Sequence, residues 1–376
     1  MFMLSLNFNI GVEKWDYKMV EIEKEPNIEL LSDVRKPTTR DIAVRLGVLS
    51  ADRVILRNFP QRTPLTVFNS SLKVENGKIY LFARLILGYY TYSSVIARII
   101  IPLSDVLKGT VSENTYEAEI IIGPDTEIDF WGSEDPRVEK VGDIYLMIYT
   151  GRTIRYFNPL AIERTVPAIA LAKNVDGRWL KFGYFTLPKK LREETITNKD
   201  TVLLDVGRNI DEYYVLHRPH LKNYPARMWI GKISKTTLTL EEPEKPRPIE
   251  VKGNRLVLKE AKFENKVGWG APPVQIKEDE WILIAHGVGK DEVYRLFAIK
   301  LTYDGGELRV SGITPSYIME PRTQYEKYGD RPNVVFICGA ERIGKNRILI
   351  TYGCADSFTG FAEIAVDELL SEIKEV

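Results

Sequence analysis

Five runs of apolar and aromatic residues recur along the chain at nearly constant spacing. The runs are GKIYLFAR at 77–84, GDIYLMIY at 142–149, DEYYVLHR at 211–218, DEWILIAH at 279–286 and KNRILITY at 345–352. Their ends lie 65, 69, 68 and 66 residues apart. A unit of this length has room for about four strands and their turns, which is the size of a propeller blade. The spacing predicts an all-β five-bladed β-propeller in which residues 1–376 form a single domain, with chance spacing among many strands as the alternative.

Both ends of the chain lie outside this repeat. The tail at 366–374 has the apolar spacing of a short C-terminal helix. Residues 1–40 precede the repeat, and we expect an N-terminal extension there that either adds a ring-closing strand or contacts another subunit. A homo-oligomer is compatible with the second alternative.

Composition excludes several classes of partner. The 376 residues include 52 basic and 52 acidic side chains, so no global charge draws the chain to nucleic acid or to an anionic membrane. No apolar run is long enough to predict a transmembrane helix, and the N-terminus lacks the features of a signal peptide. With only two cysteines, a reduced, cytoplasmic location is the simplest prediction.

Metal and cofactor chemistry is not expected. The chain has three histidines and contains neither a CxxC nor an HExxH pattern, so we predict no metal site. The GWG at 268–270 lacks the strand–loop–helix context of a nucleotide fingerprint, and no cofactor is predicted. Abundant Lys, Glu, Ile and Tyr favour a thermophilic source.

A polar or Gly/Pro-rich element precedes each of the five recurrent strands. These elements are FNSS at 68–71, GSEDPR at 132–137, NKD at 198–200, GWGAPP at 268–273 and RPN at 331–333. In a propeller the innermost strands lie side by side around the axis. Equivalent elements of five blades would therefore converge on one central cavity, where residues far apart in sequence assemble a site.

The sharpest of these elements carries two adjacent carboxylates, Glu134 and Asp135, followed by a proline. Neighbouring residues of a strand point to opposite faces, so we expect only one of them to face the cavity and the other to pair with a base such as Arg137. A partly desolvated carboxyl group there is suited to general acid catalysis. An Asp-Pro turn with a surface salt bridge is the alternative.

Two basic pairs form a second group of candidates. Lys199-Asp200 and His217-Arg218 fall at the mouths of neighbouring predicted strands. Lysine supplies a point charge and arginine a planar fork for oxyanions, so the group suits an anion of phosphate size. Solvated surface cations are the alternative.

Isolated polar and aromatic residues complete the candidates. Asp356 follows the last repeat strand and is either a sugar-binding carboxylate or a turn residue, and His286 is either a polar wall residue or a satisfied core histidine. Trp131, Trp269 and Trp281 either pack between blades or stack on a sugar, with core packing as the default.

Together these elements resemble glycoside hydrolase family 130, the β-mannoside phosphorylase family. The resemblance runs from about residue 66 to 370. It rests on the order of its motifs, which are FNSS, AR (83–84), GSEDPR, YTG (149–151), NKD, HRP (217–219), GAPP (270–273), AHGV (285–288), EPRTQYEKYGDRPNVVF (320–336) and YGCAD (352–356). The family fold is a five-bladed β-propeller, in agreement with the repeat.

The resemblance implies inverting phosphorolysis of a β-mannosidic bond, which releases α-mannose 1-phosphate. Asp135 then matches the general acid, which acts through the sugar 3-hydroxyl. The phosphate-contacting residues implied are Lys199, His217, Asn69, Ser70 and an arginine, for which Arg164 is the candidate and Arg152 and Arg155 are rivals. Substrate contacts are assigned to Arg84, Glu134, Arg137, Asp200, Arg218, His286 and Asp356. The partners are thus a β-mannoside oligosaccharide and inorganic phosphate as co-substrate.

The sequence also departs from the family pattern. Ser70 stands where many members carry proline, and NKD continues as TVLLD without a Phe-Pro pair. These departures leave the linkage and the acceptor sugar open. An inverting hydrolase needs a second carboxyl group as base, and Glu134 or Asp356 would serve in that alternative. A non-catalytic glycan-binding propeller is the third interpretation.

Overall fold

Antiparallel strands make up most of the protein, and the predicted all-β class is confirmed. The computed structural model describes residues 22–207 and 210–376. Its strands form sheets of ten, six, five and four members. The ten-stranded sheet contains two antiparallel groups that are joined at one parallel residue pair, Thr165 with Thr197.

The first two groups come, except for β15, from the first half of the chain. One group contains β4 (Thr66–Glu75), β5 (Lys78–Ile86), β6 (Ser94–Pro102) and β7 (Tyr116–Ile122), with β3 (Val54–Leu56) parallel to β7. The next contains β8 (Ser133–Val141), β9 (Ile144–Arg152), β10 (Thr165–Ala172) and β11 (Leu180–Thr186), with β15 (Arg247–Glu250) parallel to β11.

Three further groups follow. The third contains β12 (Thr195–Leu204), β13 (Glu212–Leu221), β14 (Met228–Ser234), β16 (Lys252–Leu258) and β1 (Glu23–Lys24). The fourth contains β17 (Glu264–Gly268), β18 (Val274–Lys277), β19 (Glu280–Gly289), β20 (Tyr294–Asp304), β21 (Glu307–Ile313) and β25 (Lys374–Glu375). The fifth contains β22 (Val335–Arg342), β23 (Arg347–Cys354), β24 (Phe358–Ala365) and β2 (Val44–Leu49).

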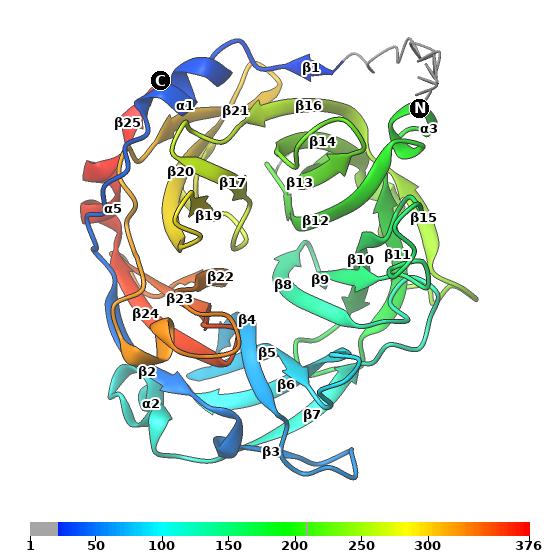
Figure 1. Ribbon diagram of the computed structural model, residues 1–376, viewed down its shortest axis with the longest axis vertical. Helices are drawn as coiled ribbons and strands as arrows, with labels where there is room; N and C mark the ends of the chain where they lie inside the picture. The colour runs from blue at the N-terminus through cyan, green and yellow to red at the C-terminus, as the bar shows by residue number, and fades with distance from the viewer. Residues whose placement is uncertain (1–21, 208–209) are drawn as a thin grey trace, which may run out of the picture.

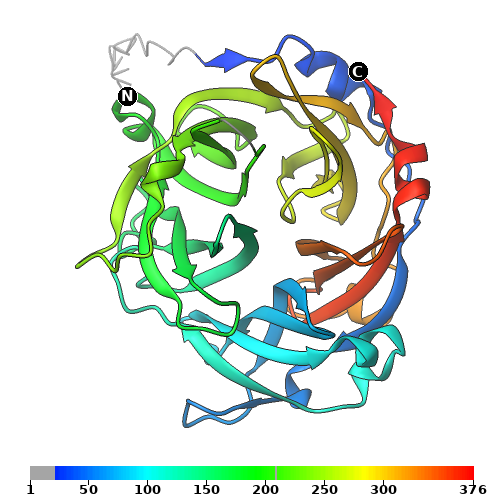
Figure 2. The same cartoon turned by 180° about the vertical axis from the view of Figure 1, so that it is seen from behind.

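The groups follow one another around a central axis, with β4, β8, β12, β17 and β22 nearest the middle (Figures 1 and 2). Each recurrent run of the sequence falls on the strand that pairs with the innermost strand of its group, namely β5, β9, β13, β19 and β23. These strands are buried along nearly their whole length. That two-sided burial explains why they are almost continuously apolar in sequence.

Helices are short and peripheral. They are α1 (Ile28–Val34), α2 (Leu103–Leu107), α3 (Lys189–Arg192), α4 (Gln324–Lys327) and α5 (Val366–Glu372), with 3₁₀ turns at Ala51–Arg53, Thr110–Ser112 and Lys235–Thr237. The predicted C-terminal helix is therefore confirmed as α5. Within residues 22–207 and 210–376 no helix combines the length and apolarity needed to cross a membrane.

An N-terminal strand joins the last group of strands. Strand β2 pairs antiparallel with β24, so residues 44–49 and 359–363 share one sheet although they stand at opposite ends of the chain. This strand begins at Val44, beyond the 1–40 segment in which a ring-closing strand was one of the two expected alternatives. Of that segment, β1 pairs with β16, and α1 packs Leu31 into the core beside β16 and β21; residues 1–21 lie outside the described part.

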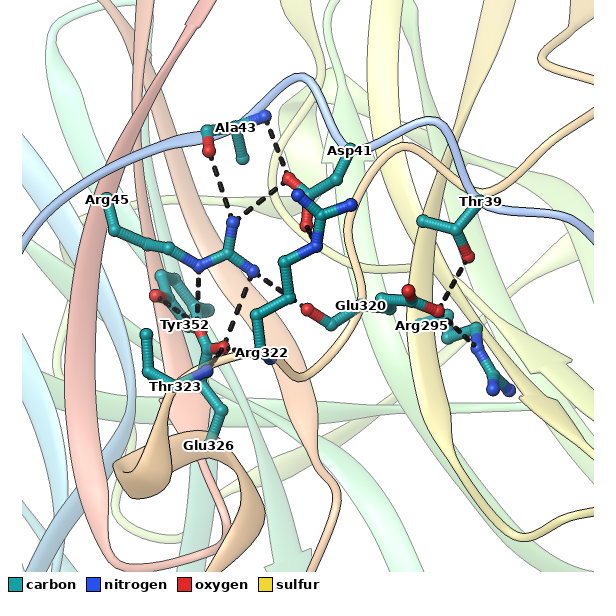
Figure 3. Close-up of polar contacts among 10 residues, drawn as sticks. All are labelled: Thr39, Asp41, Ala43, Arg45, Arg295, Glu320, Arg322, Thr323, Glu326 and Tyr352. Atoms are coloured by element: carbon teal, nitrogen blue, oxygen red, sulfur yellow. Dashed lines mark hydrogen bonds and ion pairs between the residues drawn. The ribbon is translucent and has the colours of Figure 1, made fainter.

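Charged side chains fix the start of β2 and the residues before it against the loop before β22 (Figure 3). Arg45 donates from Nη1 to Asp41 Oδ1 at 2.9 Å and from Nε to Glu326 Oε1 at 3.0 Å. The guanidinium of Arg322 approaches the other Asp41 oxygen at 3.1 Å. We call Asp41, Arg45, Arg322 and Glu326 the N-terminal clamp.

Glu326 accepts hydrogen bonds from backbone and side-chain donors. Its Oε2 accepts the backbone N–H groups of Arg322 at 2.7 Å and Thr323 at 2.9 Å, and its Oε1 accepts the Tyr352 hydroxyl at 2.8 Å. Backbone and side-chain donors thus compensate its full burial. The clamp fixes the start of the loop that continues to Arg331 in the central pocket.

Candidate active site

A repeated backbone irregularity positions the central residues. The pairing of β4, β8 and β12 with their neighbours shifts register at Phe68/Ser71, Glu134/Arg137 and Lys199/Val202. Within each shift one residue adopts a positive φ, at Asn69 (47°), Asp135 (51°) and Asp200 (52°). Asparagine and aspartate tolerate this conformation better than other non-glycine residues, and such bulges re-aim side chains.

These three side chains line one central pocket of about 220 Å³. It is lined by six cationic side chains, Arg84, Arg152, Lys199, Arg218, Lys266 and Arg331. It also contains four carboxylates, Glu134, Asp135, Asp200 and Asp356. Its remaining lining residues are Asn69, Tyr92, Tyr156, His286, Tyr294, Val334 and Phe336. Residues from all five strand groups therefore converge there, and four of the five polar elements contribute to the lining; the element at 268–273 does not.

Asp135 is fixed through one of its two oxygens. Asn69 Nδ2 and Arg84 Nη1 donate to Oδ1 at 2.8 and 3.0 Å. The carboxylate is buried, and among the described residues no hydrogen bond reaches Oδ2. The side chain is thus oriented by neighbours while one oxygen is left for a substrate.

Glu134 lines the same pocket, contrary to the strand alternation expected for this pair. The bulge at Asp135 breaks the alternation, so both carboxylates face inward. Glu134 is held by Arg84 and Arg152, each at 2.6 Å, and not by Arg137. Arg137 is buried below the pocket, where it donates to the backbone oxygens of Gly270 at 2.7 Å and Asp135 at 2.9 Å.

Asp200 is buried among basic side chains. Arg218 Nε donates to Oδ2 at 2.6 Å, and Arg137 Nη2 approaches Oδ1 at 3.4 Å. Burial by itself raises the pKa of Asp200, but Arg218, Arg137 and Lys199 outweigh it and hold that pKa well below its usual range. Asp200 therefore remains ionised and serves to orient Arg218.

His286 is a pocket wall residue whose ring stays neutral. Burial lowers its pKa to about 3, and its Nε2 lies 3.6 Å from Asp200 Oδ2. A Cβ on Gly268 would meet His286 Cε1 at 2.5 Å and Asp200 Oδ2 at 2.6 Å. The glycine of GWG at 268 is thus required for the close approach of β17 to the pocket.

Four residues predicted to contact substrates lie outside the pocket lining. They are Ser70, Arg137, Arg164 and His217. His217 is fully buried between Asn198 (3.0 Å) and Asn254 (2.9 Å), and burial lowers its pKa to about 4. Because Arg218 faces the pocket, strand alternation turns His217 away, so this geometry gives no support to a neutral His217 as a phosphate ligand.

The other three have structural partners. Ser70 is fully buried and bonds to the hydroxyl of Thr359 at 2.7 Å. Arg164 donates to the backbone oxygen of Tyr156 at 2.7 Å. Among the three candidate arginines the one in the pocket is Arg152, whereas Arg155 lines a separate, smaller pocket.

Three pocket cations have no ion-pair partner among the described residues: Lys199, Lys266 and Arg331. Lys266 Nζ donates to the Tyr294 hydroxyl at 2.6 Å. Burial, reinforced by Arg218, Lys199 and Arg331, lowers the pKa of Lys266 to about 8. Uncompensated cations of this kind make the pocket receptive to an anion.

Asp356 differs from the other carboxylates. Burial raises its pKa to about 6; the charge of Asp135 adds to the rise and Arg84 opposes it. It has a positive φ of 51° in the turn between β23 and β24. Near neutral pH this side chain therefore exists in both protonation states, which suits hydrogen bonds with sugar hydroxyls.

Several lining residues were not singled out from the sequence. Tyr92, Tyr156, Lys266 and Tyr294 lie outside the five polar elements and the family motifs. Arg331 and Phe336 lie within the motif at 320–336, and Arg331 also begins the RPN element; these are the signals that could have found them. Of the tryptophans, Trp269 and Trp281 are core residues, as expected by default.

The comparison with known families decides the class. Residues 33–375 match the model of glycoside hydrolase family 130, described as beta-1,4-mannooligosaccharide phosphorylase. The chain belongs to this family. Membership confirms the prediction of a phosphorylase-type enzyme of the β-mannoside class.

The individual relatives share less than a third of their aligned residues with this chain. The chain is 29% identical over 305 residues to a 1,2-beta-oligomannan phosphorylase from Thermoanaerobacter sp. strain X514, with 81% of this chain and 91% of the relative covered. A beta-1,2-mannobiose phosphorylase of the same organism is 26% identical with the same coverage. The solved beta-1,2-mannobiose phosphorylase from Listeria innocua, in complex with beta-1,2-mannobiose, matches with a TM-score of 0.67. At 19% identity over 88% of this chain and 98% of that one, this likeness shows the fold.

Proposed function

We propose that the enzyme catalyses inverting phosphorolysis of a β-mannosidic bond and releases α-mannose 1-phosphate. The observation that carries the proposal is the arrangement of the pocket, in which oriented Asp135 lies among cations that lack ion-pair partners in the described chain. A phosphorylase needs one acid and an anion site, whereas an inverting hydrolase needs an acid and a base.

In the proposed step a phosphate oxygen attacks the anomeric carbon from the face opposite the leaving group. A new C–O bond forms as the β-glycosidic C–O bond breaks. The proton of Asp135 passes through the sugar 3-hydroxyl to the leaving oxygen, and the Asp135 carboxyl becomes a carboxylate. It regains a proton from solvent before the next turnover. Arg84 and Asn69 orient the acid throughout, since both bind Oδ1.

Phosphate is assigned to the cations that line the pocket. Lys199 keeps the role that its motif implied, and Lys266 and Arg331 complete a group that takes the phosphate charge. Arg152 is the arginine of the 152–164 segment best placed to assist, because it lines the pocket beside Glu134. In the hydrolase alternative, Asp356 would be the base; its raised pKa gives that alternative a physical basis.

The two Thermoanaerobacter relatives favour a β-1,2 linkage for this substrate, although the family description names β-1,4. We further propose that the five strand groups are the blades of one five-bladed propeller and that catalysis needs no metal ion.

The test is an assay of purified protein with β-1,2- and β-1,4-mannobiose, each with and without inorganic phosphate. We expect mannose 1-phosphate only with phosphate and mainly from the β-1,2 disaccharide. Free mannose formed at equal rates in both conditions would establish a hydrolase. Binding without turnover on a wider panel of glycans would favour the non-catalytic alternative.

A further inference from the structure

A chain of aromatic side chains leads from the central pocket to the protein surface. Tyr156 lines the pocket, and its ring centroid lies 5.1 Å from that of Phe157. Phe157 contacts Trp131 at 4.9 Å, and Trp131 contacts Phe130 at 5.2 Å. Phe157 and Phe130 are 60% and 47% exposed. We call Phe130, Trp131, Tyr156 and Phe157 the aromatic shelf.

The shelf is built from two segments that flank β8 and β9 and are held together by backbone hydrogen bonds. The N–H of Trp131 donates to the oxygen of Arg152, and the N–H of Arg152 donates to the oxygen of Gly132, both at 2.9 Å. The N–H of Ile154 donates to the oxygen of Glu127 at 2.8 Å. The aromatic side chains therefore project from a backbone that is already ordered.

The shelf is also continuous with the reaction centre. The Arg152 guanidinium lies over the Tyr156 ring at 4.4 Å and pairs with Glu134 at 2.6 Å. Glu134 precedes the proposed acid, Asp135, in the same bulge. One continuous line of contacts thus connects the site of bond cleavage with the exposed rings.

The pocket itself is too small for a long substrate. Its volume of about 220 Å³ is below the range of about 300–1,000 Å³ typical of pockets that enclose drug-sized ligands. A mannoside longer than a disaccharide, bound together with phosphate, must therefore extend out of the pocket. Exposed aromatic rings offer the apolar C–H faces of pyranose rings a surface to pack on, and contiguous exposed apolar groups commonly mark binding sites.

We propose that the aromatic shelf binds the mannosyl units that lie beyond the disaccharide at the reacting bond, so the enzyme prefers longer mannooligosaccharides. This inference rests on the proposed function, because it concerns the chain length of that substrate. Continuity with the pocket favours a saccharide occupant over a second copy of the chain.

The test is the ratio of kcat/KM for the trisaccharide to kcat/KM for the disaccharide, measured with phosphate in excess. For the native enzyme we expect a ratio of about ten, the gain from one added aromatic contact. Phe157→Ser should lower this ratio toward one, and Phe130→Ser should act mainly on the tetrasaccharide. Leu160→Ala is the matched control, because Leu160 is 89% exposed nearby and belongs to no ring contact of the shelf.

Two results would overturn the proposal: a ratio near one in the native enzyme, or an unchanged ratio in both shelf variants. A change of oligomeric state in Phe157→Ser with an unchanged ratio would assign the shelf to a second copy of the chain. Tryptophan fluorescence titrations with mannotetraose in the absence of phosphate separate this inference from the proposed function. Tighter binding of the tetrasaccharide than the disaccharide, lost in Phe157→Ser, would support the shelf even if no mannose 1-phosphate formed.

Discussion

Two groups of charged side chains, the N-terminal clamp and the central pocket, use similar residue types for different purposes. The clamp has two carboxylates and two guanidinium groups, and its charges balance. The pocket has six cations against four carboxylates, a formal surplus of two positive charges. Balanced charges hold two segments together, whereas a surplus leaves capacity for an anionic substrate.

The largest expected effect is the loss of activity when the proposed general acid, Asp135, is replaced. Asp135→Asn should lower kcat/KM for phosphorolysis by about 10²–10⁴-fold, the usual contribution of a general acid. The melting temperature should change little, because Arg84 keeps its ion pair with Glu134. Steady-state assays and thermal unfolding test both points. Activity close to that of the native enzyme would remove Asp135 from the proposed role.

A substitution in the N-terminal clamp should lower stability and leave catalysis in the folded protein unchanged. Arg45→Met leaves Asp41 and Glu326 buried without their main counterion, so we expect a loss of about 3–5 kcal/mol in the free energy of unfolding. Arg53→Met is the control, since the exposed pair with Asp52 contributes about 0–1 kcal/mol. Denaturant unfolding measures the difference. Loss of kcat in folded Arg45→Met would show that the two regions are not separable.

A phosphate-specific effect would sharpen the comparison. Lys199→Ala should raise the phosphate KM about 10–100-fold, as expected for one lost bond to a charged group, and raise the mannoside KM much less. Lys259→Ala, at a surface pair with Glu29, should change neither constant. Equal effects of Lys199→Ala on both substrates would contradict the proposed role in phosphate binding.

A smaller effect is expected from pH. The Lys266 ammonium is present below its pKa of about 8 and is lost as pH rises through that value, so the phosphate KM should increase there by less than tenfold. Lys266→Arg keeps its charge and should flatten this part of the profile. An unchanged profile in this variant would mean that another group titrates.

No effect is expected from metal removal. Incubation with EDTA should leave phosphorolysis unchanged, because no group of three or more potential ligands is arranged for a metal within the described residues. Full loss of activity that returns with a divalent ion would contradict the metal-free proposal.

The sequence predicted the elements of the site better than the direction of each side chain. The recurrent runs became the strands that pair with the innermost strands of the five groups, and Asn69, Asp135, Lys199 and Asp356 reached one pocket, as their place in the repeat indicated. Strand alternation failed at Glu134 because a bulge re-aims the neighbouring Asp135. His217 and Arg218 show the converse case, since regular alternation there admits only one of the two to the pocket.

The sequence by itself determined the strand repeat, the family and the chemical character of the pocket, because all three depend on local pattern and residue type. Only the tertiary structure decided which cations remain without partners, since the pairing of Arg84 with Glu134 and of Arg218 with Asp200 joins different strand groups or neighbouring strands. The tertiary structure also decided which residues meet in the aromatic shelf and in the N-terminal clamp. Phe130 meets Phe157 through Trp131, and Arg45 meets Glu326, because strand pairing, including that of β2 with β24, brings together segments that no local pattern relates.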